Sequence, residues 1–299
     1  MKENILKQKK IIGFSLGIFL IVAETFAFLI SIMLKKMNYI TTENSNLIKY
    51  IVNAISIYVI GYGLLKLMLK NVETIPKKAK VKLKFADIIL LICITIGGAQ
   101  IANIVTQIII KIIQIIFNIK INNGVTELLS KSNPVYMVIF AAILGPIMEE
   151  LIFRKTLLEK LRAYGDKTAI IYTAIAFGLF HCNFAQIPFA IVVGCILGYA
   201  KVKTNSMLLP IVLHISINTL SVILTIALQK ASVVVMAIII LLIFICIILT
   251  LIFVPIKFAT NKIQIDNKGK YEKRNLYKNI GYIFSVVTIV IITIVSNIL

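Results

Sequence analysis

Few ionisable side chains interrupt the apolar segments of this 299-residue chain, and these few are the candidates for chemistry. They include Glu149, Glu150, Arg154 and both histidines of the sequence, His181 and His214. A charged group at the centre of a membrane-spanning helix costs about 2.5–3.5 kcal/mol on insertion scales, so such groups normally face a protein interior or a water-filled cavity. We therefore expect these residues to contribute to a buried site.

Helical spacing gives the two adjacent glutamates different roles. Glu150 and Arg154 are four residues apart, so they share one helix face and can form an ion pair that holds Glu150 ionised and rigid. Glu149 points about 100° away from that face and has no charged partner nearby in the sequence. A carboxylate that is shielded from water and free of a cation suits a general base.

These residue types match the steps of peptide hydrolysis. The reaction needs an activated water, a proton donor for the leaving amine and hydrogen bonds to a developing oxyanion. Glu149 would activate the water, and His181 would orient and polarise it. His214 and Asn218 are four residues apart, so they share a helix face and would donate hydrogen bonds to the oxyanion. These residues are therefore suited to a site that activates water and stabilises an oxyanion, as hydrolysis of a peptide bond requires.

A catalytic zinc would use the same side chains in another way. Glu149, His181 and His214 would supply three ligands and leave the fourth position open to water, the usual arrangement of a catalytic zinc site. The two histidines are far apart in the sequence, so no local ligand spacing decides between the two mechanisms. We favour the metal-free glutamate mechanism and keep zinc as the alternative cofactor.

Membrane-spanning helices must position these residues. Hydrophobic residues make up 60% of the chain, and the mean hydropathy is +0.98. A spanning helix needs about 20 predominantly apolar residues, and runs that are continuous rather than alternating favour helices over barrel strands. We predict an all-α transmembrane helical bundle of eight or nine spans, at about residues 11–34, 48–69, 86–110, 134–153, 168–187, 188–202, 206–228, 233–256 and 279–298.

The distribution of basic residues predicts the orientation of the bundle. The chain has 32 Lys and Arg residues against 12 acids, a formal net charge of +20. If the amino terminus is cytoplasmic and each span reverses direction, 24 basic residues fall in cytoplasmic segments and six on the opposite side. This asymmetry follows the positive-inside rule. We therefore predict a multi-pass protein of the cell membrane with a cytoplasmic amino terminus, in which the basic excess faces lipid and serves topology rather than nucleic acid.

Residue counting predicts that two of the candidates lie at one depth. Gly165, in a polar turn, lies 16 residues after Glu149 and 16 before His181. At 1.5 Å per residue, an antiparallel hairpin folded at Gly165 places both side chains about 24 Å from the turn. We therefore expect Glu149 and His181 to face one another in the cytoplasmic half of the bilayer.

Three motifs in order resemble those of a known family. They are E-E-x-x-x-R at Glu149, Glu150 and Arg154, F-x-x-x-H at Phe177 and His181, and H-x-x-x-N at His214 and Asn218. They are similar to the motifs of the CAAX-protease and bacteriocin-processing family of intramembrane proteases, also called the Abi or type II CAAX prenyl endopeptidase family. This resemblance implies an enzyme that cuts a membrane-associated protein or peptide, and the family is commonly labelled metalloprotease.

The resemblance also divides the chain and suggests a role. It covers about residues 134–225, so we expect 134–225 to be the catalytic core, with further transmembrane helices at 1–133 and 226–299. A composition rich in Ile, Lys and Asn predicts a bacterial source, for which the resemblance implies bacteriocin processing or self-immunity. A non-catalytic membrane protein that binds a peptide toxin is the alternative, and a proton-coupled transporter is a less favoured one.

Overall fold

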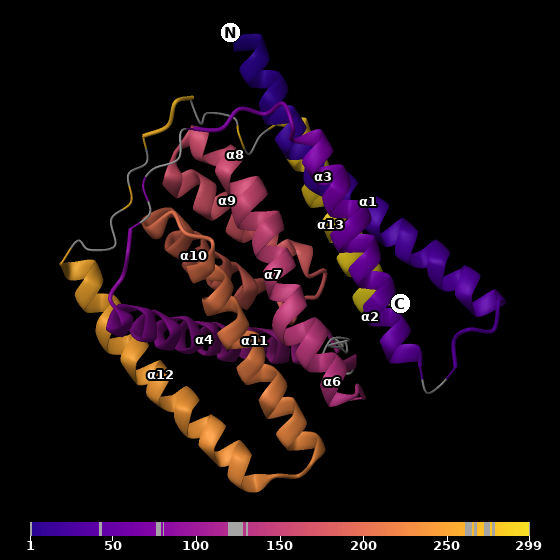
Figure 1. Ribbon diagram of the computed structural model, residues 1–299, viewed down its shortest axis with the longest axis vertical. Helices are drawn as coiled ribbons and strands as arrows, with labels where there is room; N and C mark the ends of the chain where they lie inside the picture. The colour runs from indigo at the N-terminus through magenta and orange to yellow at the C-terminus, as the bar shows by residue number, and fades with distance from the viewer. Residues whose placement is uncertain are drawn as a thin grey trace.

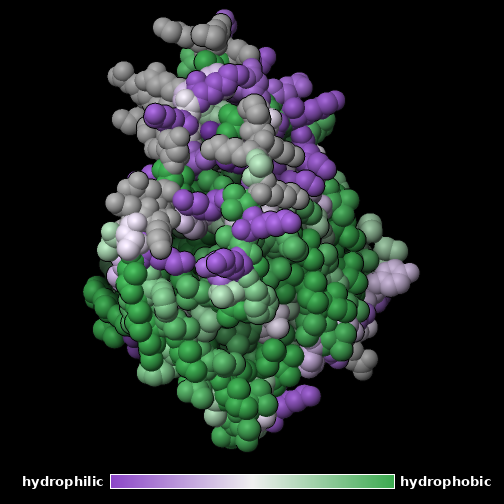
Figure 2. All heavy atoms as spheres, turned by 60° about the vertical axis from the view of Figure 1, so that its left-hand side comes forward, coloured by the Kyte–Doolittle hydropathy of each residue, from purple (hydrophilic) through white to green (hydrophobic). Residues whose placement is uncertain are grey.

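The computed structural model describes residues 2–41, 44–75, 79, 81–118, 128–129, 131–260, 265, 268–271, 276 and 279–298. All regular structure in this part of the chain is helical, which confirms the predicted all-α class. Seven helices are long and apolar enough to cross a membrane, and α13 (Ile280–Ile298) is a shorter apolar helix. Hydrophilic side chains gather at one end of the molecule, and apolar side chains cover most of the remaining visible face (Figure 2).

The helices follow most of the predicted spans. The first span is α1 (Lys2–Lys36), and the second is the continuous run of α2 (Ser45–Ala54), η1 (Ile55–Gly61) and α3 (Tyr62–Met68). The later spans are α4 (Phe85–Phe117), α10 (Ile187–Thr204), α11 (Leu208–Gln229) and α12 (Val233–Ala259). α1 packs along α13, and α4 along α12 (Figure 1). Segments from the two ends of the chain therefore pair with each other.

The span predicted at 134–153 is part of a longer helix. This helix runs from Pro134 to Tyr164 as α6 (Pro134–Tyr136), η2 (Met137–Leu144), α7 (Gly145–Glu150), η3 (Leu151–Leu158), α8 (Glu159–Leu161) and η4 (Arg162–Tyr164). Its segments η2 and η3 are π-helical, as is η1 in the second span. Short π-helical stretches inside α-helices occur frequently at functional sites, and η2 and η3 flank the two adjacent glutamates.

The predicted span at 168–187 is wrong in its second half. α9 (Asp166–Phe180) has only 15 residues, about 22 Å, which is shorter than the hydrocarbon core of about 30 Å. The chain then turns and returns as α10, which packs along α9. Hydropathy missed this turn because it is short and lies between two strongly apolar segments. Non-helical backbone is tolerated at such a depth when protein surrounds it.

Contact between α4 and α12 depends on one glycine. A Cβ atom at Gly97 would lie 2.3 Å from both the carbonyl oxygen of Cys246 and Oγ1 of Thr250. We expect Gly97→Ala to lower the free energy of unfolding by about 1–3 kcal/mol, as overpacking does, which thermal unfolding in detergent would measure. Gly63→Ala is the matched control because nothing lies within 4 Å of its Cβ position. Equal stability of the two variants would contradict this packing.

Candidate active site

A buried ion pair anchors the helix that carries the two glutamates. Arg154 Nη1 lies 3.0 Å from Glu150 Oε1, and both side chains are fully buried. Nη2 of Arg154 donates a hydrogen bond of 3.3 Å to the carbonyl oxygen of Gly194 on α10. The four-residue spacing predicted this pair. Its burial and the contact with α10 make it an anchor between two helices.

His214 on α11 lies between the two glutamates. Its Nδ1 is 2.9 Å from Oε1 of Glu150, and its Nε2 is 3.6 Å from Oε2 of Glu149. A carboxylate only accepts hydrogen bonds, so Nδ1 carries the hydrogen and donates a hydrogen bond to Glu150. The distance of 3.6 Å exceeds that of a normal hydrogen bond, so Nε2 faces Glu149 but is not hydrogen-bonded to it. The buried ion pair therefore fixes the orientation of this imidazole.

His181 is the first residue after α9, at the start of the turn to α10. Its Nδ1 lies 2.8 Å from the carbonyl oxygen of Phe177. The carbonyl only accepts, so Nδ1 is the protonated nitrogen and Nε2 keeps its lone pair. The turn is held by Asn183, whose side chain accepts a hydrogen bond of 2.9 Å from the backbone N–H of Ala185. His181 therefore presents an acceptor nitrogen from a fixed loop position.

The ring of Phe177 is the common neighbour of these groups. It meets His181 edge-on with ring centroids 4.9 Å apart, and His214 likewise at 5.5 Å. The guanidinium of Arg154 lies over the same ring, 4.5 Å from its centroid. Phe177 is fully buried on α9. One aromatic ring therefore sets the spacing between both histidines and the ion pair.

Asn218 lies one helical turn beyond His214 on α11. Its Nδ2 donates a hydrogen bond of 2.9 Å to the carbonyl oxygen of Ala141 in η2. An amide nitrogen has two N–H groups, so one is used to hold α11 against η2 and the other remains for a ligand. Asn218 thus has an interhelical role in addition to the catalytic one predicted from its spacing.

Most of the predicted site residues come together in the fold. Glu149 and Glu150 lie on α7, which contacts α11, and Arg154 lies on η3, which contacts α9 (Figure 1). Glu149 lies within electrostatic range of His181, as the equal counts to Gly165 predict. Gly165 itself has φ 110°, a conformation that favours glycine, and forms the turn before α9. Asn218 is the exception, because its side-chain amide bonds to the backbone of η2.

The comparison with known proteins finds one family model that is similar to this segment. Residues 131–220 match the Rce1-like family of type II CAAX prenyl endopeptidases. The match confirms the resemblance inferred from the three motifs, and all six candidate residues from Glu149 to Asn218 lie inside it. It implies a membrane-embedded protease with a membrane-associated substrate. No match was found among curated proteins or among solved structures.

A catalytic zinc in the Rce1-like segment would need three protein ligands close together. No three His, Cys, Asp or Glu side chains in the described part of the chain are grouped as ligands of one metal ion. His214 and Glu149 do face one another, with 3.6 Å between Nε2 and Oε2. His181, however, does not complete a three-ligand cluster with them in this arrangement. In the described residues, therefore, only His214 and Glu149 of the three candidate ligands are shown face to face.

A second buried network closes the end of the Rce1-like segment at Gly165. Nε and Nη2 of Arg162 donate to the two carboxylate oxygens of Asp166 at 2.7 and 3.3 Å, and Lys201 Nζ lies 2.5 Å from Glu159. Arg162 and Lys201, like Arg154, are buried. The prediction that the basic excess faces lipid is therefore wrong for Arg162 and Lys201, whereas Arg154 is buried in the ion pair that its spacing predicted. Charge counting missed this because it does not distinguish a lipid-facing lysine from one paired across helices.

Sequence reasoning also missed Tyr58, which lies in η1 outside the Rce1-like match. Its hydroxyl would be 3.5 Å from a Cβ at Gly145, and Oε1 of Glu149 would be 3.9 Å from the same point. The second span therefore borders the site. No motif or spacing links Tyr58 to Glu149. The only hint in the sequence is that a tyrosine with a polar hydroxyl lies inside an apolar span.

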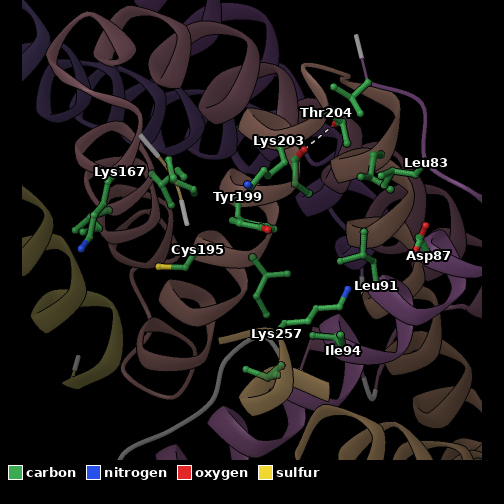
Figure 3. Close-up of a pocket in the computed structure, with 18 residues that line it drawn as sticks. Leu83, Asp87, Leu91, Ile94, Lys167, Cys195, Tyr199, Lys203, Thr204 and Lys257 are labelled. Carbon is green, nitrogen blue, oxygen red and sulfur yellow. Dashed lines mark hydrogen bonds between the residues drawn. The ribbon is translucent and has the colours of Figure 1, made fainter. Parts of the chain in front are cut away.

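A large cavity lies elsewhere in the bundle. It has a volume of about 910 Å³ and opens between α4, α9, α10 and α12. Its wall is mostly apolar, with Lys203 and Lys257 among its lining residues, and the carbonyl oxygen of Thr204 at its edge accepts a hydrogen bond of 3.0 Å from the backbone N–H of Val81 (Figure 3). None of the six candidate residues lines it. The cavity is therefore separate from the Glu149 site.

Proposed function

We propose that this chain is an intramembrane endopeptidase that hydrolyses a peptide bond in a membrane-associated protein or peptide. The observation that carries this proposal is that His181 and His214 both pack against Phe177, while Nε2 of His214 faces Glu149. Glu149 has no Lys or Arg ion-pair partner among the described residues, and its side chain is 16% exposed. It therefore remains available to a water molecule and to substrate.

The first step is addition of water to the scissile carbonyl. Nε2 of His181 accepts a hydrogen bond from the water and orients it, while Glu149 takes the other proton as the water oxygen attacks the carbonyl carbon. The reaction places negative charge on the carbonyl oxygen. Donors aimed at that oxygen lower the barrier because they stabilise charge that develops only in the transition state.

His214 and Asn218 are the proposed donors to this oxyanion. His214 donates through Nδ1 to Glu150, and its Nε2, when it also carries a hydrogen, donates to the oxyanion. Asn218 contributes the N–H that is not bound to Ala141. When the carbon–nitrogen bond breaks, Glu149 passes its proton to the leaving amine. The products are a carboxylate and an amine.

We further propose a bacterial protein of the cell membrane with a cytoplasmic amino terminus, which acts in bacteriocin processing or self-immunity. The one-sided distribution of hydrophilic side chains supports the orientation, and the composition supports the source. A toxin-resistance assay separates this role from binding alone. If the protein protects cells when Glu149 or His181 is replaced, capture of a toxin rather than cleavage explains the protection.

Metal dependence gives a test of the mechanism. We expect the protein, reconstituted in vesicles with membrane-anchored reporter peptides, to cleave at the same rate before and after treatment with a chelator, because the proposed base is a carboxylate. Elemental analysis of the purified protein would accompany the assay. Stoichiometric zinc, with activity lost on chelation and restored by zinc, would instead assign Glu149, His181 and His214 as ligands.

A further inference from the structure

Tyr58 approaches the site from the second span. It belongs to η1, and its hydroxyl lies beside Gly145, one turn before Glu149 on the neighbouring helix. A single point at the Cβ position of Gly145 is 3.5 Å from the Tyr58 hydroxyl and 3.9 Å from Oε1 of Glu149. The phenol and the carboxylate therefore border the same small space, which is open because residue 145 has no side chain.

Gly145 is part of a row of small residues that leads to Glu149. Ala141, Gly145 and Glu149 follow at intervals of four along this helix. Polar groups from other helices approach each of them: Asn218 bonds to the carbonyl of Ala141, Tyr58 lies beside Gly145, and His214 faces Glu149. Hydrogen-bonding groups from the second span and from α11 therefore come close to the helix that carries Glu149.

The Tyr58 hydroxyl has no hydrogen-bond partner in the described part of the chain, although the residue is largely buried and packs against the main core. Buried tyrosine hydroxyls usually find a partner. By contrast, Tyr62, four residues later on the same helix, binds the carbonyl oxygen of Leu151 at 3.3 Å and lies 3.2 Å from Oγ1 of Thr156. The Tyr58 hydroxyl is therefore a donor that the protein itself leaves unused beside the proposed base.

We propose that the Tyr58 hydroxyl donates a hydrogen bond to the carbonyl oxygen of the scissile peptide bond and is a catalytic residue of the site. This assignment rests on the proposed peptidase function. It adds a donor from η1 to the donors His214 and Asn218 on α11, so that the developing oxyanion is held from two helices. The active site then includes a span that lies outside the Rce1-like segment.

Tyr58→Phe tests the assignment because it removes only the hydroxyl. We expect kcat for reporter cleavage to fall by about 10²-fold with KM little changed, the loss typical of one oxyanion donor. Tyr50→Phe is the matched control: Tyr50 lies in the same span and stacks on Phe140 at 5.3 Å, and its hydroxyl is 3.3 Å from Oγ of Ser132. A kcat for Tyr58→Phe equal to that of Tyr50→Phe would overturn the proposal.

A second variant separates donation from a packing role. Difluorotyrosine at position 58 keeps the ring and the hydroxyl but makes the phenol more acidic. If Tyr58 donates, this variant retains most of the kcat that Tyr58→Phe loses, because the hydroxyl is still present. A loss of kcat as large as that of Tyr58→Phe would overturn the assignment. Retained activity in Glu149→Gln would instead overturn the peptidase mechanism, so failure of the inference and failure of the proposed function remain distinguishable.

Discussion

Replacement of Glu149 by Gln is expected to reduce kcat for peptide cleavage by about 10²–10⁴-fold, the range that general-base catalysis contributes. The amide keeps the shape of the carboxylate but cannot accept the proton of the attacking water. Because Glu149 is not part of the buried ion pair with Arg154, the fold should persist. The measurement is initial-rate cleavage of membrane-anchored reporter peptides by the purified variant in vesicles, with thermal unfolding measured in parallel.

Glu24→Gln is the matched control for this experiment. Glu24 is also an acid within an apolar helix, but it lies on α1 and has an exposed side chain. We expect its kcat to equal that of the parent protein. His181→Ala should resemble Glu149→Gln, since both act on the same water. Cleavage that persists in both Glu149→Gln and His181→Ala would show that the proposed mechanism is wrong.

Removal of one partner of the buried ion pair is expected to have the largest effect on stability. Arg154→Leu leaves the fully buried Glu150 without its cation. We therefore expect the free energy of unfolding to fall by about 3–5 kcal/mol. Glu150→Leu should be similarly unstable because Arg154 is then the uncompensated charge. Unfolding in detergent, followed by temperature or denaturant, measures both.

The double variant shows whether the loss comes from an unpaired charge. Glu150→Leu with Arg154→Leu should be more stable than either single variant, because no buried charge remains. The control is the exposed pair of Lys270 and Glu73, with Nζ and Oε2 2.8 Å apart and side chains 58% and 42% exposed. Loss of that pair should have no measurable effect. Additive losses in the Glu150 and Arg154 variants would contradict this account.

Hydropathy predicted the helices better than it predicted where they end. The continuous apolar runs correctly placed α1, α4, α10, α11 and α12. It failed at the turn from His181 to Gln186, because six residues of mixed polarity between two apolar segments hardly change the hydropathy averaged over a span. It also gave no sign of the π-helical segments on either side of Glu149, because these alter hydrogen-bond spacing without altering hydrophobicity.

The sequence alone determined the membrane helices, the ion pair of Glu150 with Arg154, and the three motifs that resemble the protease family. All of these depend on composition or on spacing within one helix, which a linear sequence records. The tertiary structure decided which residues meet across helices: His214 against both glutamates, Phe177 between the histidines, Asn218 on Ala141 and Tyr58 beside Gly145. Such contacts depend on how helices cross and rotate, and no spacing along a single helix encodes that.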